Sequence, residues 1–220
     1  MDKKRRNVVV TGATGGLGPA VVESFRASGD AVITVSRKHA DISADLTKPE
    51  EVERAFREIV EAHRSVDVLV HVMGGFASGG TIEETEPEIW QRMLNLNLLS
   101  AVYAFHAVIP LMRELKQGRL IAVGSRAGLH PSPGLSAYSV SKAALHSLVQ
   151  TAAAELVPHG ITVNAVLPGT IRTNANLEAM GADKSSTWVE PSSIAQVIHH
   201  LASHAAANVS GALIPVYGRS

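Results

Sequence analysis

The stretch TGATGGLG at Thr11–Gly18 decides the fold of this 220-residue chain. It follows an apolar run, NVVVT, that is typical of a buried strand, and it leads into a segment with helical periodicity. Gly12 permits a sharp turn after the strand, Gly16 lets a ligand approach the backbone, and Gly18 permits close packing of the helix. Free N–H groups at the start of the helix would then bind a phosphate. A plain tight turn that needs glycine for its backbone angles is the alternative interpretation.

Strand-like and helix-like segments alternate along the whole chain. We expect strands at Asn7–Thr11, Ala31–Val35, Asp67–Val72, Arg119–Gly124, Ile161–Leu167 and Ala212–Tyr217, and helices at Gly16–Ser28, Glu50–His63, Glu86–Lys116, Ser136–Val157 and Ser192–Ser203. Pro110 predicts a kink or break in the long helical region. Residues 36–49 leave room for only an abbreviated unit, whose strand is expected to be short.

This alternation predicts the α/β class, as a single-domain Rossmann-type fold. The expected architecture is a doubly wound, mainly parallel, seven-stranded sheet with helices on both faces. One domain over residues 1–220 accounts for the length, with a short tail at residues 1–6. The polar segment Asn174–Glu190 follows a strand end, so we expect a flexible loop there, near the binding site.

Composition excludes several other classes of protein. The 20 basic residues equal the 20 acidic ones, so we expect neither nucleic acid nor an anionic membrane as a partner, and we interpret the basic run before Asn7 as a solvated tail. With no cysteine, disulfides and thiolate chemistry are excluded. We expect no membrane span, no signal peptide and a cytoplasmic location. His200 and His204 lack a third ligand at useful spacing, so no metal is expected.

The second strand ends in Ser36-Arg37-Lys38, where dinucleotide-binding folds that prefer NAD carry an acidic residue. A hydroxyl, a guanidinium and an ammonium suit a 2′-phosphate, so the cofactor is expected to be NADP rather than NAD. A basic surface pair without a ligand is the alternative. Asp45 and Leu46 are expected to edge the adenine, although Asp45 would equally serve as a helix cap.

Ser125, Tyr138 and Lys142 form the predicted catalytic group. Tyr138 and Lys142 are four residues apart on a predicted helix, so they share one face. An ammonium beside a phenol lowers the phenol pKa, and such a tyrosine can exchange a proton with an alcohol or a carbonyl oxygen. Ser125 follows a strand at the ligand-binding edge of the sheet, where its hydroxyl would polarise the substrate oxygen.

With these motifs, the chain resembles the short-chain dehydrogenase/reductase family over nearly its whole length. The motifs that carry the resemblance, in the family's order, are TGATGGLG at Thr11–Gly18, DVLV at Asp67–Val70, LNLN at Leu94–Asn97, GSRAG at Gly124–Gly128, YSVSK at Tyr138–Lys142, GITVNAVLPGTIRT at Gly160–Thr173 and the terminal SGALIPVYG. The resemblance implies that Tyr138 is the general acid/base, that Ser125 holds the substrate oxygen and that Lys142 also binds the nicotinamide ribose. It implies that Asn97 holds a water in a proton relay.

The resemblance also completes the expected cofactor site, with Pro168, Gly169 and Thr173 at the nicotinamide. The predicted cofactor contacts are Gly12, Thr14, Gly15, Gly16, Leu17, Gly18, Ser36, Arg37, Lys38, Asp45, Leu46, His71, Gly74, Tyr138, Lys142, Pro168, Gly169, Ile171 and Thr173. His71 stands where the family commonly has asparagine. We interpret it as a residue that hydrogen-bonds across the strands; a titrating active-site group is the alternative.

The substrate is expected to be a small carbonyl or alcohol compound, contacted by Phe76, Arg126 and Trp188. Some features resemble the dihydropteridine reductase branch of the family, which makes such a reduction one alternative. A non-catalytic NADP-binding module is another. The small-residue stretch at residues 151–154 and the long helical region would build a subunit interface, and the resemblance implies a homodimer or a homotetramer.

Overall fold

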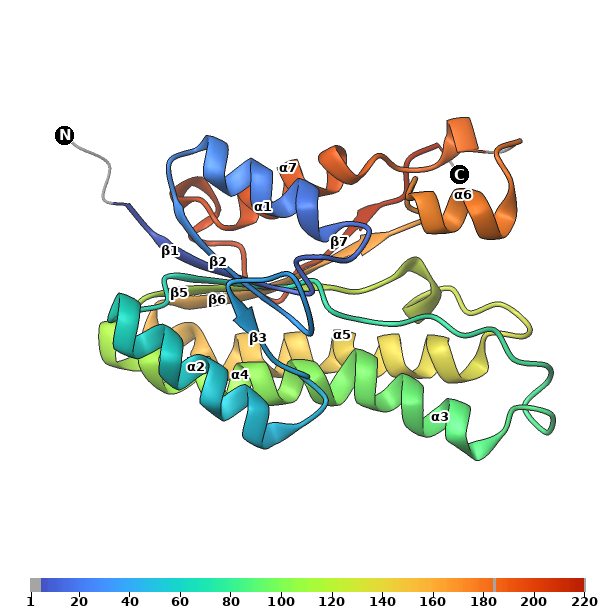
Figure 1. The fold of residues 1–220 in the computed structure, drawn as a ribbon, viewed down its shortest axis with the longest axis horizontal. Coiled ribbons are helices and arrows are strands. Elements are labelled where there is room, and N and C mark those ends of the chain that lie inside the picture. Colours follow the sequence, from blue (N-terminus) through green and yellow to red (C-terminus); the bar gives the residue numbers. More distant parts are fainter. Residues whose placement is uncertain (1–4, 184, 220) are drawn as a thin grey trace.

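The computed structural model describes residues 5–183 and 185–219, and within them the strands form one parallel sheet of seven (Figure 1). The strand order is β3-β2-β1-β4-β5-β6-β7, and every neighbouring pair is parallel. The strands are β1 Asn7–Thr11, β2 Ala31–Ser36, β3 Ile42–Ser43, β4 Val68–His71, β5 Gly118–Val123, β6 Ile161–Pro168 and β7 Leu213–Val216. The predicted doubly wound α/β fold is confirmed.

Helices cover both faces of the sheet, as Figure 1 shows. On one face lie α1 Gly18–Ala27 and α7 Pro191–Leu201; on the other lie α2 Pro49–His63, α4 Ser100–Leu115 and α5 Ser136–Leu156. The shorter helices are α3 Pro87–Leu94 and α6 Asn174–Met180. Alternate residues of β1 serve the two faces, because side chains along a strand point to opposite sides. Val8 and Val10 pack toward α1 and α7, while Val9 packs toward α2, α4 and α5.

The abbreviated unit between β2 and α2 is confirmed. Strand β3 has only two residues and pairs Ile42 with Val35. The turn before it is held by Asp41, whose carboxylate accepts hydrogen bonds from the N–H of Thr34 at 2.9 Å and from its hydroxyl at 2.7 Å. This short connection leaves the carboxyl end of β2 open beside the first glycine turn.

Of the kink or break predicted at Pro110, the structure has no break. Helix α4 runs through Pro110, and the irregularity lies earlier, in a π-helical turn at Asn95–Leu99 that joins α3 to α4. By length and composition alone, the segment Pro87–Leu115 would be long and apolar enough to cross a membrane. Packing on the sheet accounts for part of this apolar character, because Phe105, Val108 and Met112 are buried against the sheet.

The expectation of a flexible loop at residues 174–190 is wrong. Residues 174–190 are not a simple loop, because they contain α6 and a 3-10 turn at Ser185–Thr187, with residue 184 outside the described residues. Val189 is buried and bridges to Ile171, which ties the segment to the sheet edge. The N-terminal tail is anchored at Arg6, which pairs with Asp30 at 2.6 Å; residues 1–4 lie outside the described residues.

Candidate active site

A cleft of about 1150 Å³ opens at the carboxyl ends of β1, β2 and β4. The chain crosses from one face of the sheet to the other at this point, since β2 follows β1 on one side and β4 lies on its other side. Ligands of doubly wound sheets bind at such a switch point. The cleft is lined by Gly12, Thr14, Gly15, Gly16, Leu17, Ser36, Arg37, Lys38, Ala44, Asp45, Leu46, Thr47, Val72, Met73, Gly74, Glu88, Gln91, Arg92, Asn95, Leu96, Val123 and Ile171.

The glycine turn lines this cleft, and at Gly12 and Gly16 a side chain would meet other parts of the protein. Gly12 has a left-handed φ of +68°, and a Cβ atom there would lie 2.6 Å from the backbone nitrogen of Met73. A Cβ atom on Gly16 would lie 2.7 Å from Cγ2 of Thr173. The structure thus brings Gly16 and Thr173, which are far apart in sequence, into direct contact. Gly18 packs against the turn itself rather than against the strand, facing the carbonyl of Ala13.

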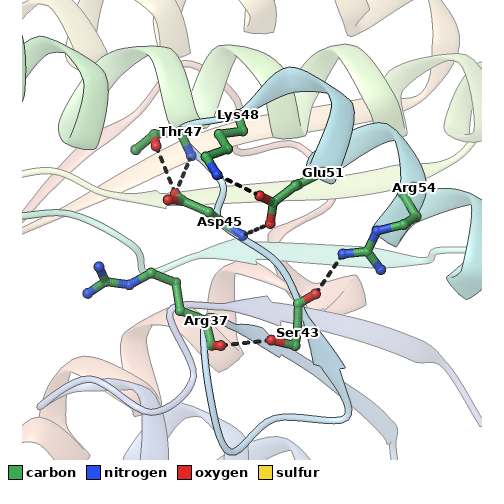
Figure 2. A network of polar contacts seen from close by, with 7 residues as sticks. All are labelled: Arg37, Ser43, Asp45, Thr47, Lys48, Glu51 and Arg54. Carbon is green, nitrogen blue, oxygen red and sulfur yellow. Dashed lines mark hydrogen bonds and ion pairs between the residues drawn. The ribbon is translucent and has the colours of Figure 1, made fainter.

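One end of the cleft carries the basic residues that follow β2. The Oγ atom of Ser36 accepts a hydrogen bond from the N–H of Thr14 at 3.3 Å, which joins the two turns. Arg37 and Lys38 line the cleft and are exposed. In Figure 2 the Arg37 side chain extends away from the neighbouring polar network, and only its carbonyl joins it, by accepting from the Ser43 hydroxyl at 2.7 Å. Among the described residues the Arg37 guanidinium has no hydrogen-bond partner.

Asp45 does not cap helix α2, so that alternative is wrong: the N-cap residue is Lys48. Instead, Asp45 closes a local turn, since its Oδ1 accepts from the N–H of Thr47 at 3.0 Å and from the Thr47 hydroxyl at 2.8 Å (Figure 2). Its own N–H donates to Glu51 at 2.8 Å. Burial raises the pKa of Asp45, but the Thr47 hydrogen bonds and the charges of Lys48 and Arg37 bring it below its usual value. Asp45 is therefore ionised, and its side chain lines the cleft.

Ser125 and Tyr138 meet where β5 ends and α5 begins. Ser125 is buried and caps a 3-10 turn, where its Oγ accepts from the N–H of Ala127 at 3.2 Å. It also forms a side-chain hydrogen bond with Tyr138. The ring of Phe76 packs edge-on against Tyr138, with ring centroids 5.0 Å apart, and Phe76 itself is 63% exposed. The predicted serine–tyrosine pair is brought together, beside the predicted substrate residue Phe76.

Lys142 lies one helical turn after Tyr138 and is buried. Its Nζ donates a hydrogen bond to the carbonyl of Val123 at 2.8 Å, and burial lowers the lysine pKa to about 8. The Tyr138 pKa differs from the expectation: burial raises it, and the hydrogen bond to Ser125 only partly opposes this. Because the ammonium is directed toward Val123, the expected lowering of the Tyr138 pKa by Lys142 is not present in this structure.

Asn97 holds the loop that follows β4. It is fully buried in the π-helical turn, where its Oδ1 accepts from the N–H of Gly75 at 2.9 Å. Its Nδ2 donates to the Gly75 carbonyl and to the Ser141 hydroxyl, both at 3.0 Å. A Cβ atom on Gly74 would lie 2.8 Å from Oδ1 of Asn97 and 3.2 Å from Nζ of Lys142. The side chains of Asn97 and Lys142 therefore both lie against Gly74.

His71 bridges elements across the sheet, as expected from its structural interpretation. Its Nδ1 lies 2.9 Å from the hydroxyl of Thr11 on β1, and its Nε2 lies 3.1 Å from the hydroxyl of Ser100 on α4. Burial, together with the nearby charge of Lys142, lowers the His71 pKa to about 3. His71 is thus neutral over the ordinary pH range, which opposes the alternative of a titrating active-site group.

The remaining predicted residues are spread around the mouth of the site. Pro168 ends β6, Gly169 donates to the carbonyl of Val216 at 3.2 Å, and Thr173 caps α6. The Arg126 guanidinium lies 5.1 Å from the centroid of the Tyr217 ring. Trp188 is only 8% exposed, as is typical of a packing residue.

Sequence reasoning missed two residues that the fold places at the catalytic group. Ser141 pairs with Asn97, and His146 lies behind Ser125 with its Nε2 3.4 Å from the serine N–H. The signal for His146 was present in the sequence. It lies four residues after Lys142 and eight after Tyr138, which is the spacing of one helix face.

With the fold and site described, comparison with known proteins defines the class. Residues 6–183 match the family model described as short chain dehydrogenase, and the chain belongs to the short-chain dehydrogenase/reductase family. It is therefore an NAD(P)-dependent oxidoreductase. Enzymes of this family act on small molecules and are generally oligomeric.

Individual relatives cover nearly the whole chain. Dehydrogenase/reductase SDR family member 4 of Homo sapiens is 29% identical, over 96% of this chain and 85% of the relative. The 3-oxoacyl-(acyl-carrier-protein) reductase FabG of Vibrio cholerae is 28% identical, over 99% and 98%. Among solved structures, ElxO with NADP bound has a TM-score of 0.92 at 25% identity, covering 97% of this chain and 98% of ElxO. Aldohexose dehydrogenase of Thermoplasma acidophilum has a TM-score of 0.89 at 29% identity, covering 97% and 93%.

Proposed function

We propose that this chain interconverts a carbonyl compound and an alcohol with NADP(H), using Tyr138 as the general acid/base. The observation that carries the proposal is the hydrogen bond between Ser125 and Tyr138, at the sheet edge beside the cleft and one helical turn before the buried Lys142. When bound, the cofactor supplies or accepts the hydride. The chain contributes the binding surface and the proton.

The residues present suit a dinucleotide. Gly12, Gly15 and Gly16 line the cleft without side chains, so a pyrophosphate could approach their backbone. Leu17, the N-cap residue of α1, makes no side-chain cap hydrogen bond within the described part of the chain. The first N–H groups of α1, apart from Pro19, which has none, are then available to phosphate oxygens. Ile171 and Thr173 would border the nicotinamide, and Asp45 and Leu46 the adenine.

Arg37 supports NADP over NAD. Its guanidinium lines the cleft without a protein hydrogen-bond partner among the described residues, and Lys38 lies beside it. A planar guanidinium forms paired, charge-assisted hydrogen bonds with a phosphate group. Ionised Asp45 nearby would repel a 2′-phosphate, and the positive charges of Arg37 and Lys38 in the same cleft would have to outweigh this repulsion. We therefore assign the 2′-phosphate to Ser36, Arg37 and Lys38.

The proton step follows from the positions of three side chains. In the reducing direction, the Tyr138 hydroxyl gives its proton to the substrate oxygen while the Ser125 hydroxyl donates a hydrogen bond to the same oxygen. The Lys142 ammonium would have to turn from the Val123 carbonyl toward the tyrosine to stabilise the phenolate. Asn97 would hold the water that returns a proton to Lys142. Phe76 and Arg126 would border the substrate.

The remaining parts of the proposal concern the protein as a whole. We propose one domain over residues 1–220, a cytoplasmic location and a homodimer or homotetramer. The oligomer is supported by the family, whose members are generally oligomeric.

The deciding experiment is NADPH oxidation by the purified protein against a panel of ketones, aldehydes and quinonoid pterins, repeated with Tyr138→Phe. Turnover by the wild type that is lost in the variant, with NADPH binding retained, supports the proposal. Tight NADPH binding without turnover of any panel member would favour a non-catalytic binding module. Turnover of the pterins alone would favour a dihydropteridine-reductase-like reaction, which the exposed aromatic wall of Phe76 beside Tyr138 makes worth testing.

A further inference from the structure

A buried histidine lies directly behind Ser125 and takes no part in the proton step described above. His146 is 3% exposed and sits on the third turn of α5. Because it follows Tyr138 by eight residues and Lys142 by four, it lies on the same helix face as both. This face of α5 is directed at the end of β5, where Ser125 is held.

Within the described part of the chain, the imidazole makes one hydrogen bond, to the backbone of Ser125. The Ser125 N–H donates to Nε2 of His146, with 3.4 Å between the two nitrogens. A backbone N–H can only donate, so Nε2 must be unprotonated and the ring proton must be on Nδ1. Nδ1 is buried and has no hydrogen-bond partner among the described residues. A buried polar atom left unpaired calls for an explanation, and the contact with Ser125 provides one.

Two glycines shape the backbone around this ring. A Cβ atom on Gly124 would lie 2.5 Å from Nε2 of His146, and a Cβ atom on Gly128 would lie 2.5 Å from Cε1. One glycine precedes Ser125 and the other closes the 3-10 turn that Ser125 caps. The imidazole therefore fills the space that both glycines leave free, and the segment Gly124–Gly128 is packed onto it.

We propose that His146 is a positioning residue for Ser125: the neutral imidazole accepts the serine N–H, supports the Gly124–Gly128 backbone and so holds the Ser125 hydroxyl against Tyr138. The inference rests on the proposed function, since it assigns a role through Ser125. The depressed pKa of His146, about 4, agrees with a ring that stays neutral; burial is the main cause and the Lys142 charge the second. An apolar side chain of similar size would fill the space but would not accept the hydrogen bond.

The test compares three substitutions at this position. The Gln oxygen of His146→Gln reaches about as far as Nε2, whereas the Asn oxygen of His146→Asn reaches only as far as Nδ1, and His146→Leu has no acceptor. With the panel carbonyl that the wild type reduces best, we expect kcat to fall at least about tenfold in the Leu and Asn variants, since a small misplacement of a catalytic group can cost about a hundredfold. The Gln variant should recover most of this loss, and the Kd for NADPH should stay within about twofold of wild type in all three.

Ser125→Ala distinguishes a failure of the proposed function from a failure of the role of His146. If His146 acts through the serine hydroxyl, His146→Leu should not lower kcat further in the Ser125→Ala background. If Ser125→Ala itself leaves kcat unchanged, the proposed function fails. If Ser125→Ala is impaired while His146→Leu and His146→Asn match the wild type, only the role of His146 is overturned. Should the Leu variant fail to fold, equal kcat values for the Gln and Asn variants would overturn it.

A second readout needs no substrate. The ¹⁵N shifts of the His146 ring, assigned by comparison with His146→Gln, should show the neutral form protonated on Nδ1 at pH 7. A ring protonated on Nε2 could not accept the Ser125 N–H and would overturn the inference even if the enzyme reduces nothing in the panel.

Discussion

Lys142 and Val123 are joined by a buried hydrogen bond, in which Nζ donates to the strand carbonyl at 2.8 Å. Among the described residues this carbonyl is the one hydrogen-bond acceptor of the buried ammonium, and burial lowers the lysine pKa to about 8. A buried charge without a carboxylate partner costs stability, so a residue kept at such a position is expected to serve chemistry.

Lys142→Met should therefore stabilise the protein while abolishing turnover. The folded-state pKa lies below the unfolded value of 10.5, so Lys142 binds its proton less tightly in the folded chain than in the unfolded chain. Below pH 8 that cost is fully present, and we expect the variant to gain about 1–3 kcal/mol in the free energy of unfolding at pH 7. The gain should shrink as the pH rises from 8 toward 10.5. Urea unfolding measures it, with Lys48→Met, at an exposed lysine, as a control that changes little. A destabilised Lys142→Met would contradict this account.

Tyr138→Phe should remove the proton donor and leave the rest of the site in place. Because the ring and its contact with Phe76 remain, only the hydroxyl and its hydrogen bond to Ser125 are lost. We expect kcat to fall by about a hundredfold or more, as for other general acids, with NADPH affinity nearly unchanged. Steady-state rates and a fluorescence titration with NADPH check the two parts. Wild-type turnover in the variant would rule out the acid/base role.

Arg37→Asp should weaken NADPH much more than NADH. A charged hydrogen bond to the 2′-phosphate is lost and a repulsion is added, so we expect the Kd for NADPH to rise by about tenfold to a hundredfold. The Kd for NADH should change far less. Arg57→Asp makes the same charge change on an exposed residue of α2 that does not line the cleft, and should affect neither cofactor. Equal losses for both cofactors in Arg37→Asp would count against the assignment.

His71 should make the protein sensitive to acid. Its folded-state pKa of about 3 lies below the usual 6.5, so the unfolded chain takes up a proton that the folded chain refuses. The stability it contributes is complete above pH 6.5 and is lost as the pH falls toward 3. Between pH 6.5 and pH 5 the loss should be about 2 kcal/mol, at about 1.4 kcal/mol for each pH unit.

His71→Asn tests this, because asparagine does not titrate. Urea unfolding at pH 7 and pH 5 should show a smaller loss of stability in this variant than in the wild type. His200→Asn, at an exposed histidine of α7, should behave like the wild type. An unchanged pH dependence in His71→Asn would mean that the buried imidazole is not the acid-sensitive group.

Gly12→Ala should be far more damaging than Gly29→Ala. Both glycines have a left-handed φ, of +68° and +83°, but a Cβ atom on Gly12 meets the Met73 backbone while one on Gly29 meets nothing within 4 Å. The strained backbone alone should cost about 1 kcal/mol at Gly29. At Gly12 we expect about 3 kcal/mol or more, together with weaker NADPH binding. Thermal unfolding of both variants measures the difference, and equal costs would remove the special role of the turn.

Much of the architecture was predictable because it is encoded locally. The apolar runs at β1, β4 and β6 and the periodic segments at α2 and α5 gave element positions within about two residues of those observed. Two wrong predictions of local structure share a cause. Pro110 carries a local signal for a break, yet α4 continues because one face packs on the sheet; residues 174–190 look polar, yet Trp188 and Val189 are buried there.

The sequence by itself determined that Tyr138 and Lys142, with His146 beyond them, share one helix face, because residues four apart on a helix are neighbours whatever surrounds the helix. It also predicted the glycine turn, since the left-handed φ of Gly12 favours glycine. Only the tertiary structure decided that Ser125 meets Tyr138 and rests on His146. Those contacts join a strand end to a neighbouring helix, and their distance depends on how the whole sheet and helix layer pack.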